Sequence, residues 1–169
     1  RDLEHGHFHT FMRSEGMARG VKPVNRPDRS TWPSGTHALT HIIGISMDAN
    51  GMPIRLFTTN RWVTGEAWYK ARDISKVIGF YSIEHAQPSG PTNRWLSGMV
   101  RLFWPQIVML IQARDVCIDA WEKQNPGQDV FEDRSLEITS QADINVYVQI
   151  SAVKAALAVK AEAKQVRTV

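Results

Sequence analysis

The chain has 169 residues, of which 43% are hydrophobic and 22% are charged, and its formal net charge is +3. This length suits one domain over residues 1–169 with a sizeable core. The small charge and the lack of a dense Lys/Arg block argue against nucleic-acid binding. No apolar run reaches the roughly 18–20 residues that span a bilayer. We therefore expect a cytoplasmic protein without a membrane span. The single cysteine excludes an internal disulfide, and the missing initial methionine leaves open a lost N-terminal segment.

The first predicted strand covers residues 5–13 and carries His5, His7 and His9 at alternating positions. Successive side chains of a strand point to opposite faces, so these three histidines share one face. Residues 14–35 contain several glycines and prolines, which predict a long irregular connection.

Two further strands are predicted, over residues 36–47 and 54–60. The dipeptide Asn-Gly within residues 48–51 is typical of a tight turn, so these strands should form a hairpin. His37 and His41 lie four residues apart in the first of them and again share a face. Five of the six histidines thus fall in two strands, in phase within each.

The spacing of apolar residues then becomes helical. It predicts helices over residues 66–78, 93–123 (interrupted at Pro105) and 142–163, with a short strand at 136–139. Strands followed by helices favour separate layers over a parallel sheet. We therefore predict an α+β fold, in which a small antiparallel sheet from the N-terminal third packs against three or four helices.

The phased histidines predict a metal centre. Neighbouring residues on one face of a strand lie about 6.5–7 Å apart, close enough to share an ion, whereas His5 and His9 lie about 13 Å apart. We expect an ion held by His7, an adjacent histidine of its strand, and His37 or His41. Three ligands leave one tetrahedral position open, as in catalytic zinc sites. The alternative is a row of structural histidines that bond to their neighbours.

Residues 59–69 form the second candidate region, where the third strand leads into a helix. Glu66 is a candidate metal ligand or general base. In the structural alternative, Glu66 stabilises the first turn of the helix through the helix dipole, and the tryptophans nearby pack in the core.

Two motifs resemble those of an uncharacterised family of bacterial domains of unknown function. They are HGHFHTF over residues 5–11 and FTTNRWVTGE over residues 57–66. Together with the tryptophan-rich helical half, the resemblance covers most of the chain. It implies a bacterial origin and assigns no activity, cofactor or catalytic residue.

Two functions are compatible with these features. The first is a metal-dependent hydrolase or lyase of a small-molecule substrate, in which zinc or iron activates a bound water and Glu66 acts as base. Such an enzyme is expected to be a stable small homo-oligomer. The second is a non-catalytic accessory or structural subunit of a larger bacterial assembly, because six tryptophans and the connection at 14–35 suit protein partners. The phased histidines favour the enzyme.

Overall fold

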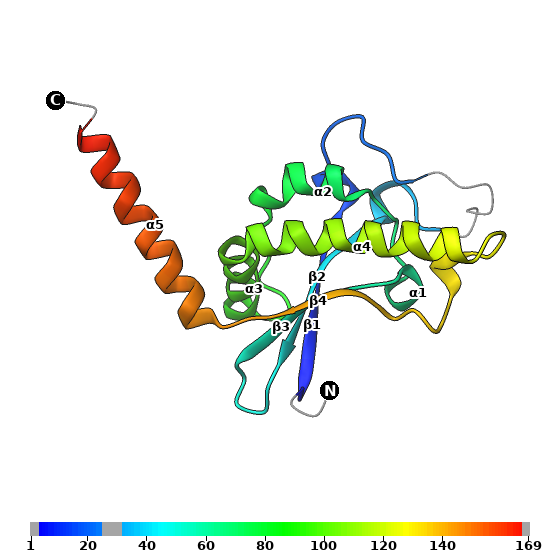
Figure 1. Ribbon diagram of the computed structural model, residues 1–169, viewed down its shortest axis with the longest axis horizontal. Helices are drawn as coiled ribbons and strands as arrows, with labels where there is room; N and C mark the ends of the chain where they lie inside the picture. The colour runs from blue at the N-terminus through cyan, green and yellow to red at the C-terminus, as the bar shows by residue number, and fades with distance from the viewer. Residues whose placement is uncertain (1–3, 25–31, 167–169) are drawn as a thin grey trace.

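The computed structural model describes residues 4–24 and 32–166, and its backbone is an α+β fold (Figure 1). Four strands form one antiparallel sheet in the order β1-β2-β3-β4. They are β1 (Gly6–Arg13), β2 (Leu39–Met47), β3 (Pro53–Thr59) and β4 (Ile138–Asp143). The predicted fold class is confirmed. The sheet extends beyond the N-terminal third, however, because its edge strand β4 comes from the C-terminal part of the chain.

The helices are α1 (Arg61–Thr64), α2 (Ala71–Val77), α3 (Gly90–Leu102), α4 (Trp104–Gln124) and α5 (Val146–Val166). α4 lies along one face of the sheet, between α2 and the strands (Figure 1). Within residues 4–24 and 32–166, no single helix is long and apolar enough to cross a membrane. α3 and α4 are long and apolar enough only when taken together, and the chain bends by 77° at the break between them.

The main core lies between the sheet and α4. Ile43 and Ile45 of β2 and Leu56 of β3 are at most 1% exposed, and they pack with Ile107 and Ile111 of α4. Burying side chains of this size contributes roughly 1.5–3 kcal/mol each. This apolar layer fixes the sheet on α4 and leaves the second face of the sheet available for polar residues.

The hairpin between β2 and β3 was largely predictable. The pair Ile45–Leu56, which the Asn-Gly turn predicts, is present. The same turn predicts that Met47 pairs with Ile54, but Met47 faces Pro53, because the register shifts immediately before Met47.

The predicted helix over residues 66–78 is wrong in its first half. A separate turn, α1, begins after Asn60, whose side chain accepts a hydrogen bond from the next backbone N–H at 2.8 Å. Gly65 ends α1 with φ 63°, a left-handed conformation that favours glycine. The chain then runs without helix until Ala71.

The C-terminal helix also begins later than predicted. Ala142 and Asp143 belong to β4, where they pair with Leu56 and Arg55. The helix itself, α5, starts at Val146 and projects away from the body (Figure 1).

Candidate functional site

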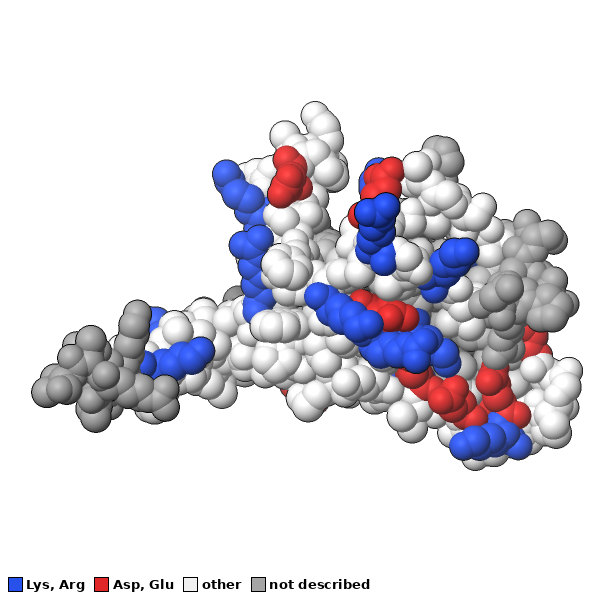
Figure 2. Space-filling view, turned by 90° about the horizontal axis from the view of Figure 1, so that it is seen from above, with Lys and Arg blue, Asp and Glu red and all other residues white. Residues whose placement is uncertain are grey.

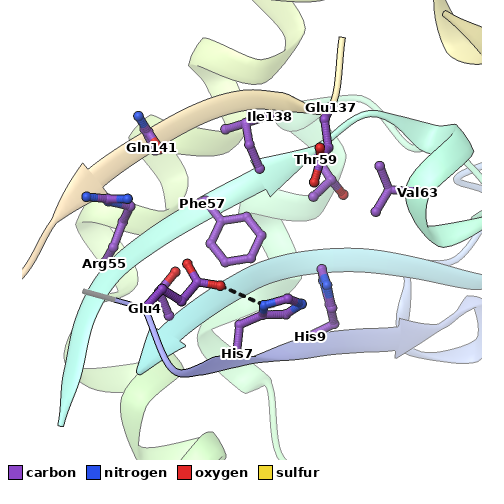
Figure 3. Close-up of a pocket in the computed structure, with 11 residues that line it drawn as sticks. Glu4, His7, His9, Arg55, Phe57, Thr59, Val63, Glu137, Ile138 and Gln141 are labelled. Carbon is purple, nitrogen blue, oxygen red and sulfur yellow. Dashed lines mark hydrogen bonds and ion pairs between the residues drawn. The ribbon is translucent and has the colours of Figure 1, made fainter. Parts of the chain in front are cut away.

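A pocket of about 400 Å³ lies on the sheet face turned away from α4 (Figure 3). Residues from all four strands line it, together with the segments before β1 and β4 and a side chain of α1. They are Glu4, His7, His9, Ser46, Arg55, Phe57, Thr59, Val63, Glu137, Ile138 and Gln141. Glu4, His7 and His9 lie on one side of the aromatic ring of Phe57, and Glu137 lies on the opposite side of the pocket near Thr59 (Figure 3).

Two hydrogen bonds hold the imidazoles of β1 in place. Nδ1 of His7 lies 2.8 Å from Oε1 of Glu4, and Nδ1 of His9 lies 3.0 Å from Nε2 of His41. The ring centroids of His7 and His9 are 4.9 Å apart. Each Nδ1 is therefore occupied by a neighbouring side chain, and both rings border the pocket.

A β-bulge places His41 beside His9. The pairing of β1 with β2 shifts between Thr10 and Phe11, so Phe11 faces His41 instead of the intervening Ile42. An extra residue in one strand reverses which face the following side chains occupy. Without the bulge, His41 would point toward α4.

Phe57 forms the apolar floor because Gly44 leaves room for its ring. The ring contacts His7 and His9 edge to face, with centroids 5.7 Å and 5.6 Å away. A Cβ at Gly44 would lie 2.3 Å from Cζ of Phe57. The glycine is therefore part of the architecture of the pocket.

Gly44→Ala is expected to push the Phe57 ring out of this position and lower the free energy of unfolding by about 1–3 kcal/mol, the usual effect of overpacking. Urea unfolding measures the change. Gly98→Ala on α3 is the matched control, because no atom lies within 4 Å of its added Cβ. Its stability should be unchanged or higher by up to about 1 kcal/mol. Equal stability of Gly44→Ala and the wild type would contradict this role.

Burial keeps two of the histidines uncharged near neutral pH. His41 is 2% exposed, and burial, with His9 and Arg114 nearby, places its pKa well below the usual value of 6.5. Burial and the proximity of His7 also lower the pKa of His9. The pair His9–His41 is therefore neutral in the folded chain at pH 7.

Stability is expected to fall as the pH drops below 6.5. The unfolded chain takes up protons on His9 and His41 near that pH, whereas the folded chain resists them. Because the unfolded state then binds more protons, acid favours it, by about 1.4 kcal/mol per pH unit for as long as buried His41 stays neutral.

Urea unfolding across this pH range checks the effect, with His41→Gln as comparator. Both chains retain Glu66, whose raised pKa makes stability rise as the pH falls toward about 4.5. Because only the wild type also has the buried His41, it should lose more stability on acidification than His41→Gln. Parallel pH profiles would show that His41 does not carry the effect.

Glu66, the predicted base, does not line the pocket. It is 2% exposed, and its Oε2 accepts hydrogen bonds from the backbone N of His41 at 2.7 Å and from Oγ1 of Thr40 at 3.0 Å. Oε1 accepts a bond from Oγ1 of Thr64 at 3.1 Å. Burial raises the pKa of Glu66, and Arg114 opposes that change. Glu66 thus anchors β2 at His41.

The predicted metal ligands are only partly brought together. His7, His9 and His41 form a row, His5 is exposed and does not border the pocket, and the side chain of His37 lies outside the described residues. Among the residues that the structure describes, no group of three or more His, Cys, Asp or Glu is arranged to hold one metal ion. Nε2 of His7 and of His9 are the nitrogens best placed to bind one.

Several pocket residues were missed from the sequence. Glu4 had a local signal, because it precedes His7 by three residues, but that spacing is common. Glu137 and Gln141 gave no signal, since only the pairing of β3 with β4 brings them to the pocket. Oγ1 of Thr59 is also notable, because it is buried without a hydrogen-bond partner in the described part of the chain.

Residues 1–144 match the family model described as Domain of unknown function (DUF6969), and the chain belongs to this family. The match includes the whole sheet and the pocket, and it ends immediately before α5. No curated protein and no solved structure matches the chain.

Proposed function

We propose that this chain is a hydrolase or lyase that acts on a small polar substrate in the pocket, with His7 and His9 as its proton-transfer pair. One observation carries the proposal. Glu4 and His41 occupy Nδ1 of the two imidazoles, while both rings border the same pocket. The Nε2 atoms of His7 and His9 are then the nitrogens that a substrate meets.

His9 serves as the base. Its lowered pKa keeps the imidazole neutral at pH 7, which is the form that accepts a proton. A backbone hydrogen bond to Ile43 uses one ring N–H of His41, so Nε2 of His41 accepts the proton of Nδ1 from His9. This tautomer leaves the lone pair of His9 on Nε2, where it takes a proton from water or substrate.

His7 serves as the acid. Burial raises the pKa of Glu4, but the hydrogen bonds from His7 and Ser46 outweigh burial and lower it, so Glu4 is ionised near neutral pH. A carboxylate at Nδ1 orients the imidazole of His7, so its Nε2 is left to face the substrate. Nε2 of His7 can then donate a proton to a leaving group while His9 gains one. One proton exchanged through water restores both residues.

A zinc or iron ion, as predicted from the sequence, would bind through the same Nε2 atoms of His7 and His9 and is therefore an alternative to their proton-transfer role, not an addition to it. Both rings already have the partner at Nδ1 that commonly orients metal-binding histidines. His41 would not be a third ligand in this arrangement, because its Nε2 bonds to His9. When bound, such an ion supplies a water of lowered pKa.

Turnover of a panel of chromogenic carboxylic esters, phosphoric esters and β-elimination substrates tests the proposal. Each assay is run as purified, with added zinc or iron, and with a chelator. We expect activity that His7→Gln removes and His5→Gln retains, since His5 lies outside the pocket. An inactive chain across the panel, or equal activity of the two variants, would contradict the proposal.

A structural subunit of a larger assembly is the second candidate function, and α5 is the observation that favours it. This helix projects from the body with Val148 and Leu157 more than 60% exposed. Native mass spectrometry should then show a second protein in fixed stoichiometry, and the chain alone would argue against this function. We place both candidate functions in the cytoplasm, in keeping with the single free cysteine, Cys117.

A further inference from the structure

We propose that Thr59 anchors the substrate through a hydrogen bond to its Oγ1, and that this substrate is an uncharged molecule with oxygen-bearing groups at both ends. The inference deepens the proposed function and rests on it, because it concerns the same pocket as His7 and His9. It assigns to β3 the task of holding the molecule on which the imidazoles of β1 act.

The hydroxyl of Thr59 is buried without a partner. Thr59 is 1% exposed and lines the pocket near Glu137 (Figure 3), and its Oγ1 forms no hydrogen bond within the described part of the chain. Thr58 is equally buried on the other face of β3, and its Oγ1 bonds to Thr139 at 2.8 Å and to Ser140 at 2.7 Å. Buried polar groups are normally satisfied, and an unsatisfied one destabilises the folded chain. Of the two adjacent threonines, only Thr59 has a hydroxyl available to a ligand.

β3 presents a second polar group to the pocket. Arg55, Phe57 and Thr59 alternate along the strand and all line the pocket. Neighbours on one face of a strand lie about 6.5–7 Å apart, so the Cα atoms of Arg55 and Thr59 lie about 13 Å apart, with Phe57 between them (Figure 3). Allowing about 2.9 Å for a hydrogen bond at each end leaves about 7 Å between the two polar groups of a bound molecule.

The pairing of the strands places the proposed base level with the middle of this row. Gly44 of β2 pairs with His9 on one side and with Phe57 on the other. His9 is therefore one step along the strands from the level of Thr59 and one step from the level of Arg55. A molecule that spans the two polar groups of β3 passes the imidazole of His9.

Arg55 suits an uncharged oxygen at its end of the pocket. Its Nε donates to Oδ1 of Asp143 at 2.8 Å, and its Nη atoms form no hydrogen bond with the described residues. Its positive charge is balanced by Asp143 and by the electrostatic attraction of Glu4. The Nη groups can therefore donate to a carbonyl or hydroxyl oxygen, but they offer no surplus positive charge to an anion.

The charges around the pocket also favour an uncharged substrate. Arg55 is the one Lys or Arg among the described residues that line the pocket, whereas Glu4 is ionised near neutral pH and His9 is neutral. An anion such as a phosphoric ester would meet the charge of Glu4 without compensation. On the face that Figure 2 shows, Lys and Arg side chains alternate with Asp and Glu over the body, so that face has no extended basic field that attracts anions.

Thermal unfolding of the full chain tests whether the hydroxyl of Thr59 lacks a partner. Thr59→Val keeps the shape of the side chain and removes the hydroxyl, so it should raise the Tm by about 2–4 °C. Thr58→Val is the matched control. It should lower the Tm by at least about 2 °C, because it removes the bonds to Thr139 and Ser140. An equal loss in both variants would mean that Thr59 has a structural partner, and would overturn the proposal.

Binding is measured by NMR titration with 5-hydroxypentanamide, which carries a hydroxyl and an uncharged amide at opposite ends. We expect an affinity about 3–10-fold weaker for Thr59→Val than for the wild type, the usual effect of one lost hydrogen bond. Thr59→Ser retains the hydroxyl and should bind within about twofold of the wild type. The matched anion, 5-hydroxypentanoate, should bind the wild type at least about threefold more weakly than the amide does.

Three results would overturn the proposal: equal affinity of the amide for the wild type and Thr59→Val, tighter binding of the anion, or no binding of either probe. Turnover separates this inference from the proposed reaction. If the amide binds through Thr59 and no panel substrate is turned over, the reaction is wrong and the anchor stands. If panel substrates are turned over with the same KM by the wild type and by Thr59→Val, the reaction stands and the anchor is wrong.

Discussion

His9→Gln is expected to lower kcat by about 10²–10⁴-fold on any panel substrate that the wild type turns over, the usual contribution of a positioned acid or base. Glutamine keeps a polar group of similar reach, but it has no nitrogen lone pair that accepts a proton at neutral pH. KM should change little, because the pocket floor at Phe57 is retained. Initial rates over a range of substrate concentrations separate the two constants.

The pH profile adds a second readout for His9. Because burial lowers its pKa, the acid limb of kcat/KM should have its midpoint below the ordinary histidine value of about 6.5. His85→Gln is the matched control, since His85 is an exposed loop residue outside the pocket. Equal losses in both variants, or an acid limb above 6.5, would contradict the assignment of His9 as base.

Glu66→Ala is expected to lower the free energy of unfolding by about 3–5 kcal/mol. The substitution would leave buried donors at Thr40 and His41 without their acceptor. It would also remove the negative charge that interacts with Arg114, which is 2% exposed. Urea unfolding at neutral pH measures this loss.

Comparing Glu66→Ala with a control substitution separates a structural role of Glu66 from the catalytic role predicted from the sequence. Glu84→Ala, at an exposed position, should change stability by no more than about 0.5 kcal/mol. If Glu66→Ala unfolds like the wild type and loses only turnover, then Glu66 is the base and its anchoring role is wrong.

Much of the fold follows from local patterns in the sequence. Alternation and the Asn-Gly turn indicate β1, β2 and β3, and apolar spacing indicates α3 and α4. β4 was mostly missed because its sequence, ITSQAD, is polar and typical of a loop. Its pairing with β3 stabilises it as a strand, and this long-range contact has no local signature.

The site was predictable in its residue types but not in its connections. The alternation of His7 and His9 correctly indicates a shared face. His41 reaches that face through a bulge that the sequence does not mark. Glu66, the predicted base, is a residue type common in active sites. Gly65 ends the preceding turn, however, and the carboxylate of Glu66 is buried among backbone and hydroxyl donors.

Nitrogen-15 NMR of the imidazole rings tests the central claim most directly, because it requires no substrate. Spectra of the full chain at neutral pH, with His9→Gln for assignment, report the protonation of each ring nitrogen. We expect His9 to be neutral, with a protonated Nδ1 that bonds to His41 and an unprotonated Nε2. A charged His9 at neutral pH, or a proton on its Nε2, would contradict a base that faces the pocket.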